Sequence, residues 1–254
     1  NKNMIKNHIL PDLGNRAVQS VSPRDIDLLF HKLRMKPCSG PKSFNKREND
    51  IPTLSTTTLR HVYFVLKKAF EKAIEWEILE TSPIAHMDPP PKRIIRNKTI
   101  WDSETVSLAI DDMKDKPELK LAVHLAFMCS LRIGETVGIT LDKINLKDNY
   151  IDIHQTLQRD EEEALALLPK DDIYFIFPKK IATSKSVLVL KRPKTETSIR
   201  RVYFEGELRN EIIERIRAIE KQKEYFGSNY KDYGLLIALE DGSPVEPKLC
   251  EKWF

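Results

Sequence analysis

The sequence predicts a mainly α-helical protein with a small antiparallel β-sheet, in which an all-helical domain is followed by an α+β domain. Apolar residues recur at helical spacing through residues 1–84. A basic stretch with three consecutive prolines then interrupts the pattern at 85–99. Alternating apolar and polar residues, which are typical of strands, appear from residue 150 onward. With 254 residues the chain is long enough for two separate cores.

The first domain, residues 1–84, is expected to be helical throughout. One helix should begin at Ser22-Pro23, because serine caps the free N–H groups of a helix start and proline fits the first helical position. The polar stretch 36–50 has a composition typical of disorder. A longer helix is predicted from Ser55 to about Trp76, with one apolar face. Its other side carries Arg60, His61, Lys67 and Lys68.

Residues 85–99 are predicted to form an extended basic linker, which is the expected domain boundary. Three prolines at 89–91 stiffen the chain there, and a single acid, Asp88, faces the cations. These cations are Lys92, Arg93, Arg96 and Lys98.

The second domain, residues 100–254, combines helices and strands. Helices are expected near 103–114, 118–129 and 131–139, and an amphipathic helix at about 206–226.

A strand is expected at 150–154, because apolar and polar residues alternate there after a turn. The segments 187–190 and 199–204 should pair as a hairpin whose connecting loop is 193–198. Residues 156–186 are poorly periodic, with one further candidate strand at 174–177.

Composition and charge exclude several classes of protein. The longest apolar run, 121–129, is far shorter than a membrane span, and no charged-then-apolar leader opens the chain, so neither a membrane partner nor secretion is expected. The three cysteines, Cys38, Cys129 and Cys250, are far apart, which argues against a disulfide framework or a zinc motif and favours the cytoplasm. The net charge of +4 is mild, so the placement of the cations is more informative than their sum.

The first candidate for chemistry is the segment Ser130 to Glu135. Ser130 is well placed to cap a helix, which would put Arg132 in the first turn beside free backbone N–H groups. A guanidinium in that position favours an anion such as phosphate, and Glu135, one turn later, could hold it from behind. The alternative is an ordinary surface Arg–Glu pair at i, i+3, which stabilises a helix weakly.

The second candidate is Lys194 in the predicted hairpin loop, from which a lysine can reach outward. Between residues 185 and 201 one acid, Glu196, faces six cations, for which nucleic acid is the obvious partner. The alternative is an edge hairpin that charge protects from aggregation. The cations are Lys185, Lys191, Arg192, Lys194, Arg200 and Arg201.

The order of these segments resembles that of the tyrosine recombinase family, the integrases of phages and conjugative transposons. The resemblance rests on Leu131-Arg132-Ile133-Gly134-Glu135, then a strand, then Pro193-Lys194-Thr195 with Ser198 and Arg200. In the first domain, segments 7–14, 22–25, 54–58 and 76–83 resemble the family's helical core-binding domain. The resemblance covers nearly the whole chain, and it implies a tyrosine-recombinase catalytic domain over 100–254.

The resemblance further implies a site-specific recombinase that cuts and rejoins duplex DNA through a 3′-phosphotyrosyl link, without metal or cofactor, as a tetramer on DNA. Arg132 would balance charge on the phosphate oxygens, Lys194 would protonate the leaving 5′ oxygen, and Glu135 would orient Arg132. Candidate DNA contacts are Thr57, Arg60, His61, Lys67, Lys68, Lys92, Arg93, Arg96, Lys98, Lys191, Arg192, Arg200 and Arg201.

The sequence also departs from the family pattern. Cys129-Ser130 replaces the usual Thr-Gly, Lys143 stands where an acid is common, and 156–186 resembles an insertion. No His-x-x-Arg follows the predicted hairpin, and Tyr225, Tyr230 and Tyr233 precede the place where that motif and the tyrosine nucleophile should come, so a fragment without its nucleophile is expected.

Three alternatives stay open at this point. One is a DNA-binding fragment or regulator without catalysis, the second is a type IB topoisomerase-like enzyme, and the third is an unrelated α+β protein.

Overall fold

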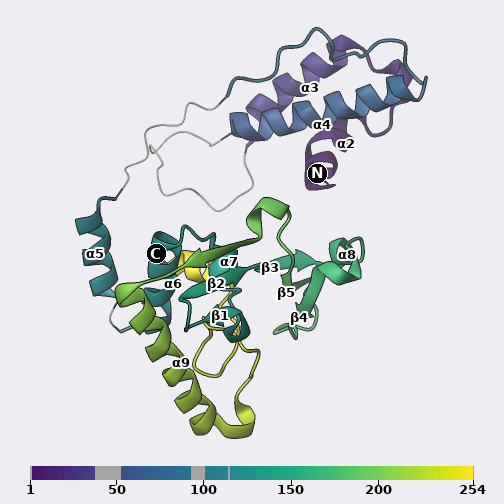
Figure 1. Ribbon diagram of the computed structural model, residues 1–254. Coiled ribbons are helices and arrows are strands. Elements are labelled where there is room, and N and C mark those ends of the chain that lie inside the picture. Colours follow the sequence, from purple (N-terminus) through teal and green to yellow (C-terminus); the bar gives the residue numbers. More distant parts are fainter. Residues whose placement is uncertain (1, 38–52, 93–100, 114, 254) are drawn as a thin grey trace. The chain divides into compact units, whose positions relative to one another are not determined.

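The computed structural model describes residues 2–37, 53–92, 101–113 and 115–253, and the chain divides into two compact units, 1–99 and 100–254 (Figure 1). The first unit is helical, and the second combines helices with two small antiparallel sheets. The predicted fold class is therefore confirmed. None of the helices within the described ranges is long and apolar enough to cross a membrane.

Two helices form the centre of the first unit, α3 (Pro23–Met35) and α4 (Thr56–Glu75). Shorter helical segments precede them: α1 (Lys2–Met4), η1 (Ile5–Ile9), α2 (Leu10–Leu13) and η2 (Val18–Ser20). The core contains Phe30 from α3 and Phe70 from α4, both almost fully buried, together with Ile84 from the segment after α4. Burial of such large apolar side chains stabilises the unit by about 2 kcal/mol each.

The predicted starts of both long helices are confirmed. The Asp25 N–H donates to Ser22 Oγ at 3.3 Å, and the Ser22 N–H donates to the Asp25 carboxylate at 2.9 Å, which is a complete capping box. At the second helix the Thr58 N–H donates to Ser55 Oγ at 3.2 Å. Most of the polar stretch predicted to be disordered, from residue 38 on, lies outside the described residues.

The first part of the predicted linker contacts the helical unit. Tyr63 Oη donates to the Met87 carbonyl at 2.9 Å, the Arg60 guanidinium donates to the Pro90 carbonyl, and Pro90 is buried. The carbonyl groups of this segment therefore accept hydrogen bonds from two side chains of α4. Arg93, Arg96 and Lys98 lie outside the described residues.

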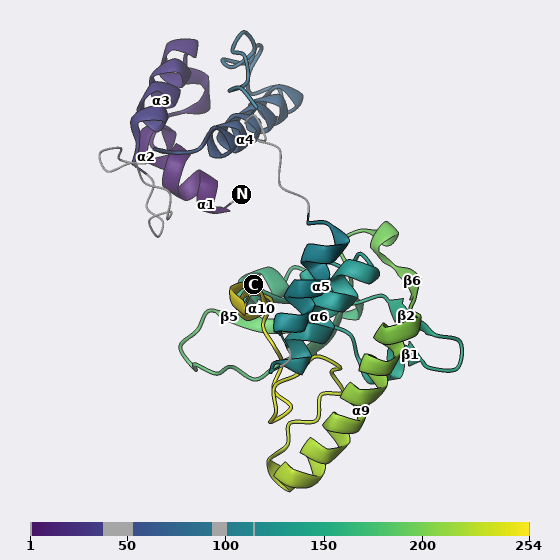
Figure 2. The same ribbon diagram turned by 90° about the vertical axis from the view of Figure 1, so that its left-hand side faces the viewer.

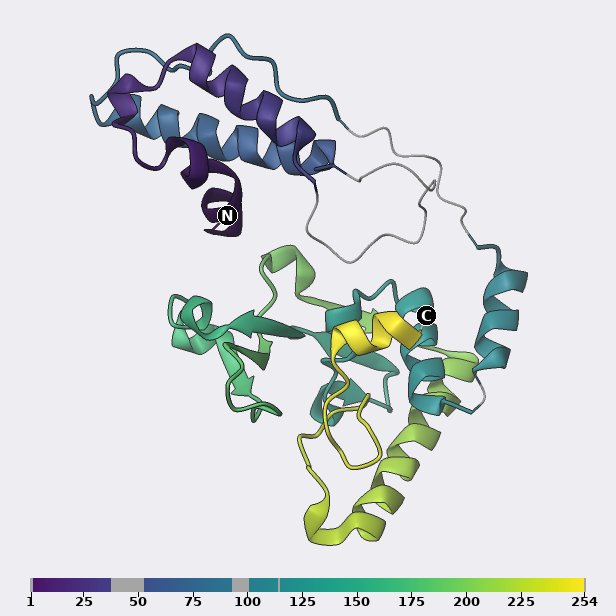
Figure 3. The same cartoon turned by 180° about the vertical axis from the view of Figure 1, so that it is seen from behind.

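In the second unit, α5 (Ser103–Asp112) lies beside α6 (Pro117–Met128), and α9 (Gly206–Phe226) packs on α6 (Figure 2). The short α10 (Pro247–Trp253) contacts α7 (Ile133–Thr136) (Figure 3). Helices at the other predicted positions are confirmed, but the helix expected over 131–139 is a single turn.

Two sheets of three strands complete the second unit. The first has the order β1 (Ile144–Asn145), β2 (Tyr150–Ile153) and β6 (Arg200–Tyr203), and the second has the order β3 (Thr156–Glu161), β5 (Ser186–Lys191) and β4 (Ile173–Ile176). Short helical segments connect them: η3 (Leu141–Lys143), α8 (Glu162–Leu165), η4 (Lys170–Asp172), η5 (Glu196–Ser198) and, after α9, η6 (Gly227–Asn229).

The predicted hairpin between 187–190 and 199–204 is wrong. β6 pairs with β2, so that Val202 lies opposite Ile151, whereas β5 pairs with β3, so that Leu190 lies opposite Leu157. Both strands therefore run antiparallel to the segment 150–161, and the loop 192–199 lies between them. Sequence proximity suggested the wrong partner, because a strand's partner depends on long-range packing rather than on local pattern.

Candidate active site

The turn between α6 and α7 positions Arg132. Ser130 adopts a left-handed backbone conformation, with a φ of 50°, and Arg132 itself occupies the capping position just before α7. Ser130 therefore does not cap the helix, which corrects the sequence-based expectation: the left-handed turn places it two residues before the cap. The Arg132 N–H instead donates to Glu135 Oε2 at 3.1 Å.

Close packing of α7 on β3 fixes this turn in place. A Cβ atom added at Gly134 would lie 2.5 Å from Thr156 Oγ1 and 2.9 Å from the Leu157 carbonyl oxygen. The glycine of the Leu-Arg-x-Gly-Glu motif is therefore required because the helix backbone and the strand backbone approach each other directly. The side chain of Gln155, just before β3, adds a further link, since its Nε2 donates to the Gly138 carbonyl at 2.7 Å.

Glu135 is the centre of a buried ionic cluster, with only 3% of its side chain exposed. Its Oε1 accepts from Arg132 Nη1 at 2.8 Å, and its Oε2 accepts from Arg200 Nη2 at 2.9 Å. Burial opposes ionisation of this carboxyl group. The hydrogen bonds from Arg200 and from the backbone and guanidinium of Arg132 outweigh that effect, so the pKa of Glu135 lies below its ordinary value.

Arg132 is held on one side and open on the other. Its Nη1 donates to Glu135 and also to Ser198 Oγ at 3.0 Å, whereas 71% of its side chain is exposed. Its Nε and Nη2 groups have no hydrogen bond to the described residues. A planar guanidinium fixed in this way can present two N–H groups to one phosphate.

The loop 192–199, which carries Lys194, is attached to this cluster. Ser198 is buried, its hydroxyl accepts from Arg132, and it shares a 2.9 Å hydrogen bond with Thr195 Oγ1. Lys194 is exposed and forms no hydrogen bond or ion pair with the described residues. Its ammonium group is therefore available on a loop that the Arg132 side chain anchors.

Several cations between residues 185 and 201 have acidic partners that the local sequence does not reveal. Lys191 pairs with Asp160 at 2.6 Å, and Arg201 pairs with Asp152 at 3.0 Å, in both cases across paired strands. Arg192 pairs with Glu196 at 2.8 Å. The expectation of one acid against six cations was therefore incomplete, because neighbouring strands supply carboxylates.

Arg200 and Ser198 also make contacts that the local sequence did not indicate. Arg200 was expected to contact DNA, but 30% of its side chain is exposed and its guanidinium binds Glu135 and the Ser198 carbonyl. A signal was present, since Ser198 and Arg200 are two of the residues on which the family resemblance rests.

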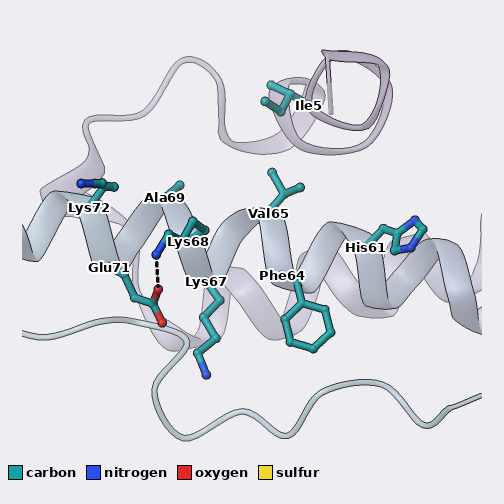
Figure 4. A pocket seen from close by; sticks show the side chains of 9 residues that line it. All are labelled: Ile5, His61, Phe64, Val65, Lys67, Lys68, Ala69, Glu71 and Lys72. Carbon is teal, nitrogen blue, oxygen red and sulfur yellow. Dashed lines mark hydrogen bonds and ion pairs between the residues drawn. The ribbon is translucent and has the colours of Figure 1, made fainter. Parts of the chain in front are cut away.

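The candidate DNA contacts of the first unit lie on α4, where Figure 4 shows a groove between this helix and η1. The groove has a volume of about 810 Å³, and Lys67, Lys68 and Lys72 line it together with apolar side chains such as Val65. Thr57, His61 and Lys67 are exposed, as is Lys92 beyond the helix. Arg60 is half-buried and holds Pro90, with its guanidinium 5.4 Å from the Phe64 ring centre.

Within the described ranges, no three histidine, cysteine or acidic side chains come together as a metal site would require. Among the described residues, the ion-pair partners of Glu135 are Arg132 and Arg200.

Comparison with known proteins gives a fold. A search against protein-family models found no match, and a search of curated proteins also found none. Solved structures match over almost the whole chain. The Tn1549 transposon integrase in complex with transposon right end DNA is 16% identical, with a TM-score of 0.66, over 96% of this chain and 66% of that one.

Two further structures agree. The Tn1549 integrase with a circular intermediate DNA has 15% identity and a TM-score of 0.67, over 99% of this chain and 71% of that one. A lambda integrase dimer bound to a COC′ core site has 13% identity and a TM-score of 0.53, over 98% of this chain and 53% of that one. The chain thus spans about two thirds of the first two and about half of the third.

These structures define the class of fold: it is the fold of the tyrosine recombinases. Among them, a transposon integrase is similar over 96–99% of this chain. The resemblance read from the sequence is thereby confirmed at the level of the fold.

Proposed function

We propose that the protein is a tyrosine-type site-specific DNA recombinase, the integrase of a mobile element such as a conjugative transposon, acting in the cytoplasm. The proposal rests on the environment of the Arg132 guanidinium. The buried Glu135 carboxylate fixes one side of this group, and its other side is exposed to solvent. It lies in a fold shared with integrases whose structures contain DNA. The proposed binding partner is duplex DNA, on which the protein would assemble as a tetramer.

In the proposed reaction Arg132 binds the non-bridging oxygens of the reacting phosphate. The phenolate oxygen of a tyrosine forms the new bond to phosphorus, the bond to the 5′ oxygen breaks, and Lys194 donates a proton to that oxygen. The 3′-phosphotyrosyl link keeps the bond energy, so a 5′-hydroxyl can reverse the step without ATP. No tyrosine of residues 1–254 is assigned this role.

Glu135 and Arg200 do not touch the phosphate in this proposal. Glu135 fixes the orientation of Arg132 and is itself held by Arg200, so that the donors are in place before charge develops. Such preorganisation costs no rearrangement at the moment of reaction, and removing one donor of this kind costs about 10²–10³ in rate.

The DNA-binding part of the proposal is tested by measuring the affinity of the 254-residue chain for a short DNA duplex against salt concentration. Each phosphate contact should contribute about −0.9 to the slope of log affinity against log salt, so a slope of several units is expected. A flat response would contradict DNA binding.

The catalytic part is tested by Arg132→Ala and Lys194→Ala in the full gene product, with Lys221→Gln on the exposed face of α9 as control. We expect strand exchange to fall at least 10²-fold in the first two variants, while DNA affinity changes only a few-fold. Trapping on nicked suicide substrates should detect a covalent protein–DNA adduct in the unsubstituted protein. Unchanged recombination in either variant would remove that residue from the site.

A further inference from the structure

A shallow groove of about 500 Å³ lies beside the Arg132 cluster, in the first sheet of the second unit. Its lining comes from η3, from β2 and the residue after it, and from the start of β6. Lys143, His154, Arg200 and Arg201 are the basic lining residues, and Asp152 is the only acid among them.

The groove and the Arg132 cluster share a residue. Arg200 lines the groove, and its Nη2 donates to Glu135, the carboxylate that also holds Arg132. One carboxylate thus separates the guanidinium of Arg132 from the groove wall. Phosphates recur at every nucleotide of a nucleic-acid strand. When one phosphate of a strand binds Arg132, the neighbouring phosphates therefore lie close to the groove.

Two of the cations can bind an anion without rearrangement of the fold. Arg201 is held flat, with its guanidinium 3.7 Å from the Tyr150 ring centre and its Nε on Asp152 at 3.0 Å, and 47% of its side chain is exposed. Lys143 pairs with its neighbour Asp142 at 2.8 Å, and 64% of that carboxylate side chain is exposed, so water can replace the lysine there.

His154 forms part of the groove wall. Its Nδ1 lies 3.2 Å from the Asp152 carbonyl oxygen, and a carbonyl can only accept, so Nδ1 donates. The tilted Tyr174 ring, 5.8 Å away, helps to fix the orientation of this ring.

We propose that this groove binds a second phosphate of the DNA backbone, adjacent to the one that Arg132 holds, with Lys143 and Arg201 as the binding groups. The inference rests on the proposed function, because it takes duplex DNA as the ligand. Asp152 has a distinct effect in this arrangement: it orients Arg201 but also repels the phosphate, so it limits the affinity.

The test measures salt-dependent binding of a short random-sequence DNA duplex by the 254-residue chain, with two substitutions of opposite expected sign. Lys143→Gln removes a binding cation, and Asp152→Asn removes the acid of the groove. Lys221→Gln and Glu224→Gln, both exposed on the last turns of α9, are the matched controls for loss of one positive and one negative charge.

Lys143→Gln should weaken binding about five- to tenfold near 0.1 M salt and reduce the salt slope by about 0.9 relative to Lys221→Gln. Asp152→Asn should tighten binding a few-fold relative to Glu224→Gln. Tighter binding cannot result from partial unfolding, so this variant keeps the test valid even if Lys143→Gln lowers the melting temperature.

A steep salt slope in the unsubstituted chain, with both groove variants equal to their controls, would overturn the groove and leave the proposed function standing. A flat slope in the unsubstituted chain would overturn both.

Discussion

Arg132 in the second unit and Lys67 in the first are both exposed cations assigned to DNA, yet their surroundings differ. Arg132 donates to a carboxylate that is 3% exposed and to a buried serine, which fix its guanidinium. Lys67 lies on the surface of α4 without a hydrogen bond or ion pair to the described residues. Its neighbour Lys68 meets Glu71 at 3.4 Å, with both side chains largely in solvent.

The difference indicates two ways of using positive charge. Exposed lysines on a helix can attract a polyanion from any direction and lose little entropy until they bind it. A guanidinium fixed by a buried acid loses its side-chain entropy when the protein folds, so it is already in one defined geometry when it binds an anion. We therefore expect the cluster around Glu135 to be sensitive to single substitutions and the surface of α4 to tolerate them.

The largest effect on the free energy of unfolding is expected for Glu135→Gln, which removes the negative charge that pairs with both Arg132 and Arg200. Breaking a buried pair typically costs 3–5 kcal/mol, and because both arginines reach solvent we expect about 3 kcal/mol here. Hydrogen–deuterium exchange of peptides from residues 119–157 in the whole chain would report the loss. Protection equal to that of the unsubstituted chain would contradict the buried pairing.

Acid pH should remove the same stability. The pKa of Glu135 is lowered on folding, so its contribution is complete above the pKa of the unfolded chain, near the ordinary 4.5. It is lost as the pH falls below that value and through the lower pKa of the folded state. The difference in stability between the unsubstituted chain and Glu135→Gln should therefore shrink below about pH 4.5.

A smaller effect is expected for Gly134→Ala, which tests how firmly the cluster is held by the backbone. The added methyl group would meet Thr156 Oγ1 at 2.5 Å and the Leu157 carbonyl at 2.9 Å, so α7 would have to move away from β3. Overpacking of this kind typically costs about 1–3 kcal/mol. Thermal unfolding measures this loss of stability.

Ala166→Gly, at the exposed end of α8, is the control. Gly206→Ala is unsuitable because Gly206 has a positive φ of 58°. A loss of stability in Gly134→Ala no greater than in Ala166→Gly would contradict close packing of α7 on β3.

The helices could largely be predicted from the sequence, because their signals are local. Ser22 and Asp25 are three residues apart, and the apolar stripes of α3 and α4 recur at helical spacing. The partners of β5 and β6 could not, because both pair with the segment 150–161, and that choice depends on the packed core.

The candidate site divides in the same way. The contact between Arg132 and Glu135 follows from their i, i+3 spacing and is present. Arg200 is 65 residues from Glu135 in the sequence, and Ser198 is 66 residues from Arg132. Only the folded structure therefore reveals that the Arg200 guanidinium binds a carboxylate of the protein itself. The role of the cluster in catalysis stays a prediction.

The smallest effect is expected for Glu71→Gln on α4, the same chemical change as at Glu135 in different surroundings. Glu71 meets Lys68 at 3.4 Å, with 47% and 74% of the two side chains exposed, and such pairs contribute about 0–1 kcal/mol. We expect the unfolding free energy to change by less than about 0.5 kcal/mol, and DNA affinity to rise slightly because one repelling charge is lost. Parallel unfolding of Glu71→Gln and Glu135→Gln measures the contrast directly. Equal losses in the two variants would mean that burial of the acid does not distinguish the two regions, and the preorganisation assigned to Arg132 would lose its physical basis.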